Sequence, residues 1–141
     1  MAQAFTQEIR IQNAVGGIDN AIQTFEAFSQ KHEIPKEIMQ KIRRVIVELL
    51  SNMIQYSSPK GQEAQVRIQL ELLCSGKLSI KMYNEGIPFN PFQITPPNTA
   101  IPLEHREIGG LGIHLVRRLM DEYSYQRTID SNVISMCKNQ V

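Results

Sequence analysis

The sequence predicts an α+β fold, a two-layer sandwich in which about three helices cover one face of a mostly antiparallel sheet. Two observations lead to this prediction. Apolar residues recur every three or four positions in three segments, as in amphipathic helices, and alternate in several others, as in strands. The strand-like segments also follow one another in pairs joined by short turns, which favours antiparallel pairing.

The first helix is expected over residues 18–32, where the apolar positions lie three and four apart. A second helix should begin at Pro35, because proline is favoured in the first turn. It continues to about Tyr56 along a buried stripe formed by Ile38, Ile42, Ile46, Leu49 and Met53. The first helix is therefore followed by a longer one with a single apolar face.

The first hairpin is expected from two alternating segments, residues 66–72 and residues 78–82. The turn between them spans residues 74–77 and contains Ser75 and Gly76, which are typical of turns. Phe5, Ile9 and Ile11 also suggest an edge strand near the start of the chain.

A long loop should follow the hairpin, because residues 86–110 contain five prolines and no regular period. A third helix is then expected across residues 113–120. A closing hairpin follows, with strands at residues 123–127 and 133–138 and a turn at residues 130–132.

The composition fits one domain spanning residues 1–141, since a chain of this length with 42% hydrophobic residues can bury one core. The formal net charge is only +1, with both signs interspersed, which argues against nucleic acid or a membrane surface as a partner. The start of the chain lacks the features of a signal peptide, so we expect a cytoplasmic protein. Two cysteines suggest neither a disulfide framework nor a zinc site.

The second helix carries the first candidate site, Glu48 and Asn52. Residues four apart lie roughly 40° apart around a helix, so both side chains point in one direction, at the edge of the buried stripe. A carboxylate there can accept a proton, and an amide oxygen beside it can coordinate Mg²⁺ that phosphates already hold. By itself the pair is also typical of a solvated helix flank.

Two glycine-containing segments complete the candidate site. Residues 83–91 (YNEGIPFNP) end the first hairpin, and Gly86 there would let the backbone approach a flat ligand. Gly109, Gly110, Leu111 and Gly112 come immediately before the third helix, where free backbone amides and the helix dipole favour phosphate.

In sequence order, these motifs resemble the GHKL (Bergerat-fold) ATPases, and within them the anti-sigma-factor serine/threonine kinases. The similarity runs from about residue 45 to residue 138. Residues 47–52 are similar to the N box, residues 84–91 to the first glycine box and residues 109–118 to the second. The continuation at residues 115–122, followed by Tyr125 and Asn132, is close to the serine-kinase branch.

The resemblance implies a role for each matched residue. Glu48 takes the position of the general base and Asn52 that of the magnesium ligand, while Gly86 packs beside the adenine of ATP. Gly109, Gly110, Leu111 and Gly112 would offer backbone amides to the phosphates, beneath a lid formed by residues 93–108 that includes Arg106.

The sequence departs from the family at one position, because Asn84 replaces the aspartate that accepts a hydrogen bond from adenine. An asparagine keeps the acceptor oxygen but loses the charge that strengthens the bond, so ATP affinity could fall by roughly tenfold.

The resemblance also implies partners, namely a small antagonist protein phosphorylated on a serine, and a sigma factor or other regulator of transcription that is sequestered. A homodimer would be in keeping with similar proteins. Two alternatives stay open. One is a catalytically silent binding module, suggested by Asn84. The other is the catalytic module of a sensor histidine kinase, which would require a phosphoacceptor helix that none of the three histidines suggests.

Overall fold

The computed structural model describes residues 4–12, 14–57, 65–93 and 110–141. Its strands and helices, in chain order, are β1 (Ala4–Ile11), α1 (Ala14–Lys31), α2 (Lys36–Asn52), β2 (Val66–Leu73), β3 (Leu78–Asn84), α3 (Gly110–Leu119), β4 (Glu122–Arg127) and β5 (Asn132–Lys138). A π-helical turn, η1 (Met53–Ser57), extends α2, and a short 3₁₀ turn, η2 (Pro91–Gln93), follows β3.

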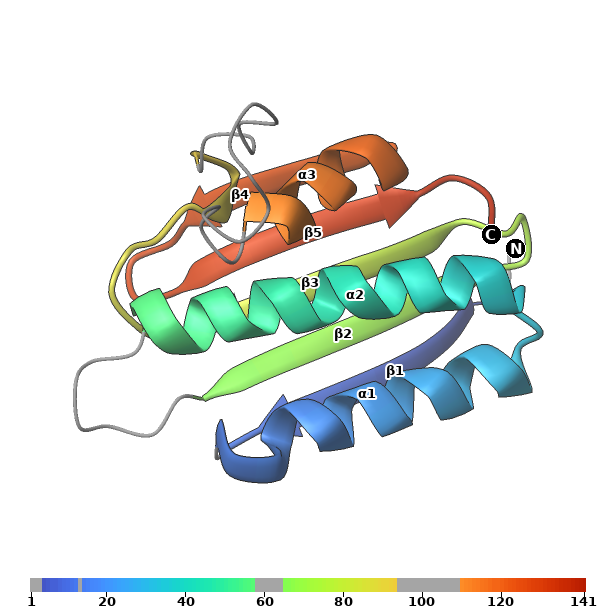
Figure 1. Ribbon diagram of the computed structural model, residues 1–141, viewed down its shortest axis with the longest axis horizontal. Helices are drawn as coiled ribbons and strands as arrows, with labels where there is room; N and C mark the ends of the chain where they lie inside the picture. The colour runs from blue at the N-terminus through green and yellow to red at the C-terminus, as the bar shows by residue number, and fades with distance from the viewer. Residues whose placement is uncertain (1–3, 13, 58–64, 94–109) are drawn as a thin grey trace, which may run out of the picture.

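The strands form one five-stranded antiparallel sheet in the order β1-β2-β3-β5-β4. All three helices lie on the same face of this sheet, which gives two layers (Figure 1). The predicted fold class is confirmed, as are both hairpins and the edge strand β1. None of the helices in the described part of the chain is long and apolar enough to cross a bilayer.

Several element boundaries differ from the sequence prediction, among them the end of α2, which lies at Asn52 rather than at about Tyr56. α1 begins at Ala14 rather than Ile18, and α3 begins at Gly110, so Gly110 and Gly112 lie in its first turn instead of preceding it. Asn132, expected in the last turn, is the first residue of β5 because it pairs directly with Asn84 across the sheet. Tertiary pairing therefore determines the start of this strand.

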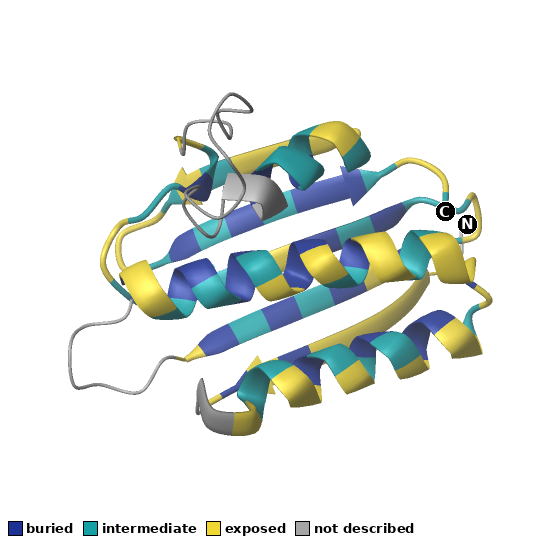
Figure 2. Ribbon diagram, viewed as in Figure 1, coloured by how far each residue is buried: buried dark blue, intermediate teal, exposed yellow. Residues whose placement is uncertain are grey.

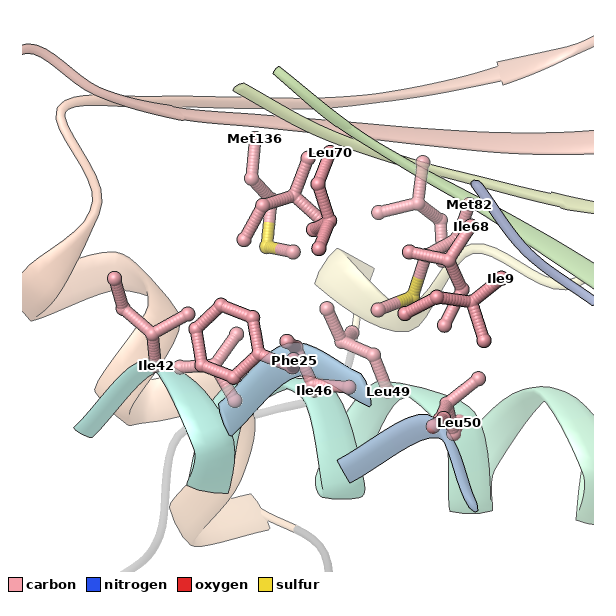
Figure 3. Packing of buried hydrophobic residues seen from close by; sticks show 14 of the residues in the cluster. Ile9, Phe25, Ile42, Ile46, Leu49, Leu50, Ile68, Leu70, Met82 and Met136 are labelled. Atoms are coloured by element: carbon pink, nitrogen blue, oxygen red, sulfur yellow. The ribbon is translucent and has the colours of Figure 1, made fainter. Parts of the chain in front are cut away.

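The core lies between the helices and the inner face of the sheet, as the buried residues in Figure 2 show. The predicted apolar stripe of α2 is buried at Ile42, Ile46, Leu49 and Met53, and Val45 and Leu50 widen it. Figure 3 shows this stripe packed beneath side chains of the sheet. Truncating a fully buried leucine in such a layer typically costs about 3 kcal/mol of stability, so α2 is anchored firmly.

The π-helical turn η1 fixes how α2 ends. Met53 and Ser57 are both buried, and the Ser57 carbonyl accepts a hydrogen bond of 2.6 Å from the Ile87 backbone N–H. This bond joins the end of α2 to the segment after β3. π-helical turns are frequent at functional sites, and this one holds the candidate site together.

Candidate functional site

The motifs predicted from sequence converge at one end of the molecule. The C-terminal end of α2, the end of β3, the start of β5 and the start of α3 all lie at the left in Figure 1. α2 packs against α3, and the two run antiparallel, so the first turn of α3 lies near the last turns of α2. Segments far apart in sequence thus form one site.

Glu48 and Asn52 lie on one flank of α2, as their spacing predicts. Glu48 is half-buried, which matches the predicted edge position. Asn52 differs, since only 5% of its surface is exposed. Directly after it, η1 continues the chain and is hydrogen-bonded to the segment after β3 through the Ser57 carbonyl and the Ile87 N–H.

Three buried polar atoms near the end of α2 have no hydrogen-bond partner within the described part of the chain. They are Oε1 of Glu48, Nδ2 of Asn52 and Oγ of Ser57. An unpaired buried polar atom typically costs about 1–3 kcal/mol, and folded proteins contain few of them. The three atoms therefore mark a place that a polar ligand could complete.

The surroundings of Glu48 raise the pKa of its carboxyl, because burial removes water from the charged form. The nearby Asn52 amide and the positive charge of Arg44 lower the pKa and offset part of this effect. The Asn52 interaction is weak, since Nδ2 makes no hydrogen bond of ordinary geometry. A carboxyl with a raised pKa is a better proton acceptor.

Ser57 is a site residue that sequence reasoning missed. A serine just beyond an amphipathic helix is typical of an exposed loop, so nothing in the local pattern indicates burial. Ser57 is fully buried at the end of the π-helical turn η1, and its carbonyl accepts a hydrogen bond from the segment after β3.

Asn84 lies at the end of β3 with 1% of its surface exposed. Its Nδ2 donates to the Gln65 carbonyl at 3.2 Å, and its Oδ1 accepts from Nδ2 of Asn132 at 3.3 Å. An asparagine suits this position because it can donate to a carbonyl and accept from an amide at once. An aspartate would face the Gln65 carbonyl with a second acceptor.

Asn132 is fully buried and all of its hydrogen-bonding capacity is used. Besides the bond to Asn84, its Nδ2 donates to the Ile87 carbonyl at 2.8 Å. Its Oδ1 accepts from the Phe89 backbone N–H at 3.1 Å and from the Tyr125 hydroxyl. Asn132 thus ties β4, β5 and the segment after β3 into one corner, which we call the Asn84–Asn132 corner.

Gly86 is required by the close approach of η1. A Cβ atom at this position would lie 2.3 Å from the Ser57 carbonyl oxygen and 2.8 Å from Oδ1 of Asn84. The Gly86 carbonyl also accepts a 2.6 Å hydrogen bond from Nη1 of Arg127. The sequence suggested that this glycine makes room for a ligand, and the structure adds that it makes room for the protein's own backbone.

The second glycine segment is described only in part. Gly110, Leu111 and Gly112 form the first turn of α3, where helix amides have no intrahelical partner. Gly109, Arg106 and the rest of the predicted lid from residue 94 to residue 108 lie outside the described residues.

Comparison with known proteins agrees with this arrangement. A family model described as the histidine kinase-like ATPase domain matches residues 11–138. The chain is 29% identical over 80 residues to a protein of Bordetella bronchiseptica (strain ATCC BAA-588 / NCTC 13252 / RB50) named serine/threonine-protein kinase BtrW, over 57% of this chain and 56% of that protein.

A similar solved structure is the histidine kinase domain from the Erythrobacter litoralis EL346 blue-light activated histidine kinase. It matches with a TM-score of 0.55 and 13% identity, covering 88% of this chain and 59% of that one. At this identity the match shows a shared fold alone. The chain spans a little over half the length of each of these two relatives.

Proposed function

Because the chain belongs to the histidine kinase-like ATPase domain family, we propose that it binds ATP with Mg²⁺ and phosphorylates a serine or threonine of a protein partner. The similarity to a protein named as a serine/threonine kinase supports this reaction. The motif order supports the anti-sigma-factor type, in which the substrate is a small antagonist and a sigma factor or other transcriptional regulator is sequestered. Such a switch would act in the cytoplasm, where ATP is available.

One observation carries the proposal, namely the group of unpaired buried polar atoms on Glu48, Asn52 and Ser57. An amide whose nitrogen makes no hydrogen bond of ordinary geometry within the described part of the chain can turn its oxygen towards a cation, and oxygen is the ligand that Mg²⁺ prefers. The residues present therefore fit Mg²⁺ bound with ATP, with Asn52 as the protein ligand. When bound, Mg²⁺ neutralises charge on the phosphates.

The proposed reaction assigns Glu48 as the proton acceptor. The acceptor hydroxyl oxygen forms a bond to the γ-phosphorus, the bond from that phosphorus to the bridging oxygen breaks, and ADP leaves. The hydroxyl proton passes to the Glu48 carboxylate, whose partial burial strengthens it as a base. Gly109, Gly110, Leu111 and Gly112 would offer backbone amides to the phosphates.

Asn84 and Gly86 are proposed to lie beside the adenine. The Asn84 amide keeps one lone pair and one N–H beyond its bonds to Asn132 and Gln65, so it can still bind a base. The same bonds favour a second candidate function. A side chain held so fully by the protein suits a catalytically silent module that regulates its partner without ATP turnover.

Calorimetric titration of the purified protein with ATP and excess Mg²⁺ distinguishes the kinase from the catalytically silent module. We expect binding in the micromolar range, weakened about tenfold or more in Asn52→Ala, which removes the proposed ligand. Asn20→Ala, an exposed asparagine on α1, is the matched control and should bind like the parent. Absence of binding in the parent would contradict the kinase proposal and favour the silent module.

A further inference from the structure

A hollow of about 370 Å³ lies in the seam between α2 and α3, on the side of the helices away from the sheet. The residues that line it are Lys41, Arg44, His114, Leu115, Arg118 and Leu119. We call it the α2–α3 groove. α2 and α3 lie side by side along this seam (Figure 1), and none of these residues is among those proposed to contact ATP or to form the Asn84–Asn132 corner.

The groove is strongly cationic, although the whole chain carries a formal net charge of only +1. Lys41, Arg44 and Arg118 are exposed, and among the described residues no acidic side chain lines the hollow. Arg44 and Arg118 form no salt bridge with a residue in the described part of the chain. Lys41 has only a 3.9 Å contact with the exposed Glu37. The positive charges of Lys41 and Arg118 are therefore local and available, while that of Arg44 also acts on the Glu48 carboxyl.

The groove also has an apolar component. Leu115 and Leu119 are half-buried and pack against the core, but each keeps part of its side chain at the surface. A mixed surface of cations around two leucines complements a segment that combines acidic and apolar side chains. A compact inorganic anion would leave the leucines uncovered.

The position of the groove connects it to the proposed reaction. Arg44 precedes Glu48 by one helical turn, and its charge acts on the Glu48 carboxyl. A chain segment lying in the groove would therefore pass close to the proposed proton acceptor. We propose that the α2–α3 groove binds an acidic, leucine-containing segment of the protein that carries the phosphoacceptor serine, an inference that rests on the proposed function.

The test measures binding of a fluorescein-labelled synthetic peptide in which glutamates flank leucine and serine. A matched peptide carries lysines in place of the glutamates. Fluorescence anisotropy with the parent protein should give saturable binding of the acidic peptide alone, weakening as salt is added. Equal binding of the two peptides, binding of neither, or tighter binding of polyuridylate RNA would overturn the proposal.

The variants Lys41→Glu and Arg118→Glu test the groove itself. Reversing either charge should weaken binding of the acidic peptide by about fivefold or more. Lys81→Glu, an exposed residue on the open face of the sheet, is the matched control and should bind like the parent. Unchanged affinity in both groove variants would overturn the proposal.

Titration of the same proteins with Mg²⁺ and ATP separates the two proposals. Lys41→Glu, which lies outside the three motifs of the ATP site, should keep the nucleotide affinity of the parent while it loses the peptide. If the parent binds the acidic peptide but not ATP, the proposed kinase function fails and the groove assignment stands. If the parent binds ATP but not the peptide, the groove assignment fails alone.

Discussion

Two buried polar clusters lie at the same end of this molecule and differ in one respect. In the Asn84–Asn132 corner, the side-chain atoms of both asparagines have hydrogen-bond partners. On the flank formed by Glu48, Asn52 and Ser57, one side-chain atom of each residue has none within the described part of the chain. Both clusters are buried, so burial does not distinguish them.

The difference teaches that unpaired atoms, rather than polarity, indicate where a ligand belongs. Asn132 stabilises the fold by joining strands and a loop, and its hydrogen bonds are complete without any ligand. Asn52 contributes no such bond, so the fold gains little from it. Asn132 is therefore a structural support, and the flank formed by Glu48, Asn52 and Ser57 is the candidate for proton transfer and Mg²⁺ binding.

The largest expected effect is the loss of stability in Asn132→Ala. The substitution leaves the Ile87 carbonyl, the Phe89 N–H and Oδ1 of Asn84 without partners, so the free energy of unfolding should fall by about 3 kcal/mol. Urea unfolding followed by circular dichroism measures it. Asn52→Ala should change the same quantity by less than about 1 kcal/mol. Equal losses in the two variants would remove the distinction between the clusters.

Gly86→Ala should produce the next largest effect. The new Cβ would meet the Ser57 carbonyl oxygen at 2.3 Å, and backbone must move to relieve the contact, which should cost about 2 kcal/mol of stability. The same urea unfolding measures the loss. At Gly16 an added Cβ meets nothing within 4 Å and only the positive φ of 78° opposes it, so Gly16→Ala should lose about 1 kcal/mol. A stable Gly86→Ala protein would contradict the close approach of η1.

Asn84→Asp should destabilise the corner by about 1.5 kcal/mol at pH 7, because the carboxylate cannot donate to the Gln65 carbonyl. Protonation of the new carboxyl restores a donor, so the loss should shrink as the pH falls. Unfolding measured across pH tests this. Asn90→Asp is the matched control, since within the described part of the chain the Asn90 side chain bonds only through its oxygen, which accepts from the Phe92 N–H. A gain in stability at pH 7 for Asn84→Asp would contradict the role of the Gln65 bond.

The smallest effect is expected for Glu48→Gln. Burial raises the pKa of Glu48, so ionising this carboxyl is harder in the folded than in the unfolded chain. The resulting penalty is absent below pH 4.5, the ordinary glutamate value, and is complete once the pH exceeds the folded-state pKa. Glu48→Gln should therefore raise the thermal midpoint at pH 7 but not at low pH.

Differential scanning calorimetry at several pH values measures this change. Glu37→Gln, on the exposed first turn of α2, is the control and should lack the pH-dependent gain. A midpoint that rises equally at low and neutral pH would show that the gain in Glu48→Gln does not come from ionisation.

Much of the fold could be predicted because its elements are local patterns. The apolar stripe of α2 and the alternation in β2 and β3 each depend on the spacing of residues within one element. The sequence therefore predicted all three elements. The start of β5 was wrong because Asn132 pairs with Asn84, forty-eight positions away. A periodic pattern within one element gives no information about a partner that far away in the sequence.

The candidate site divides in the same way. Glu48 and Asn52 could be placed on one flank by helical arithmetic, and the motif order predicted a resemblance that the family match confirms. The burial of Ser57 could not be predicted, since it depends on a π-helical turn and on a hydrogen bond to Ile87. Its unpaired hydroxyl became visible only in the folded chain.

The sequence by itself determined the helices, the hairpins and the order of the motifs, because these depend on neighbours a few positions apart. Only the tertiary structure decided which buried polar atoms are paired. The Asn84 amide is hydrogen-bonded to Gln65 and Asn132, whereas the Asn52 nitrogen is buried without a hydrogen-bond partner in the described part of the chain. Both residues are asparagines in segments that resemble family motifs, so residue type alone does not distinguish them. The physical reason is that hydrogen bonds are made between atoms brought together in space, and sheet register and helix packing determine which atoms meet.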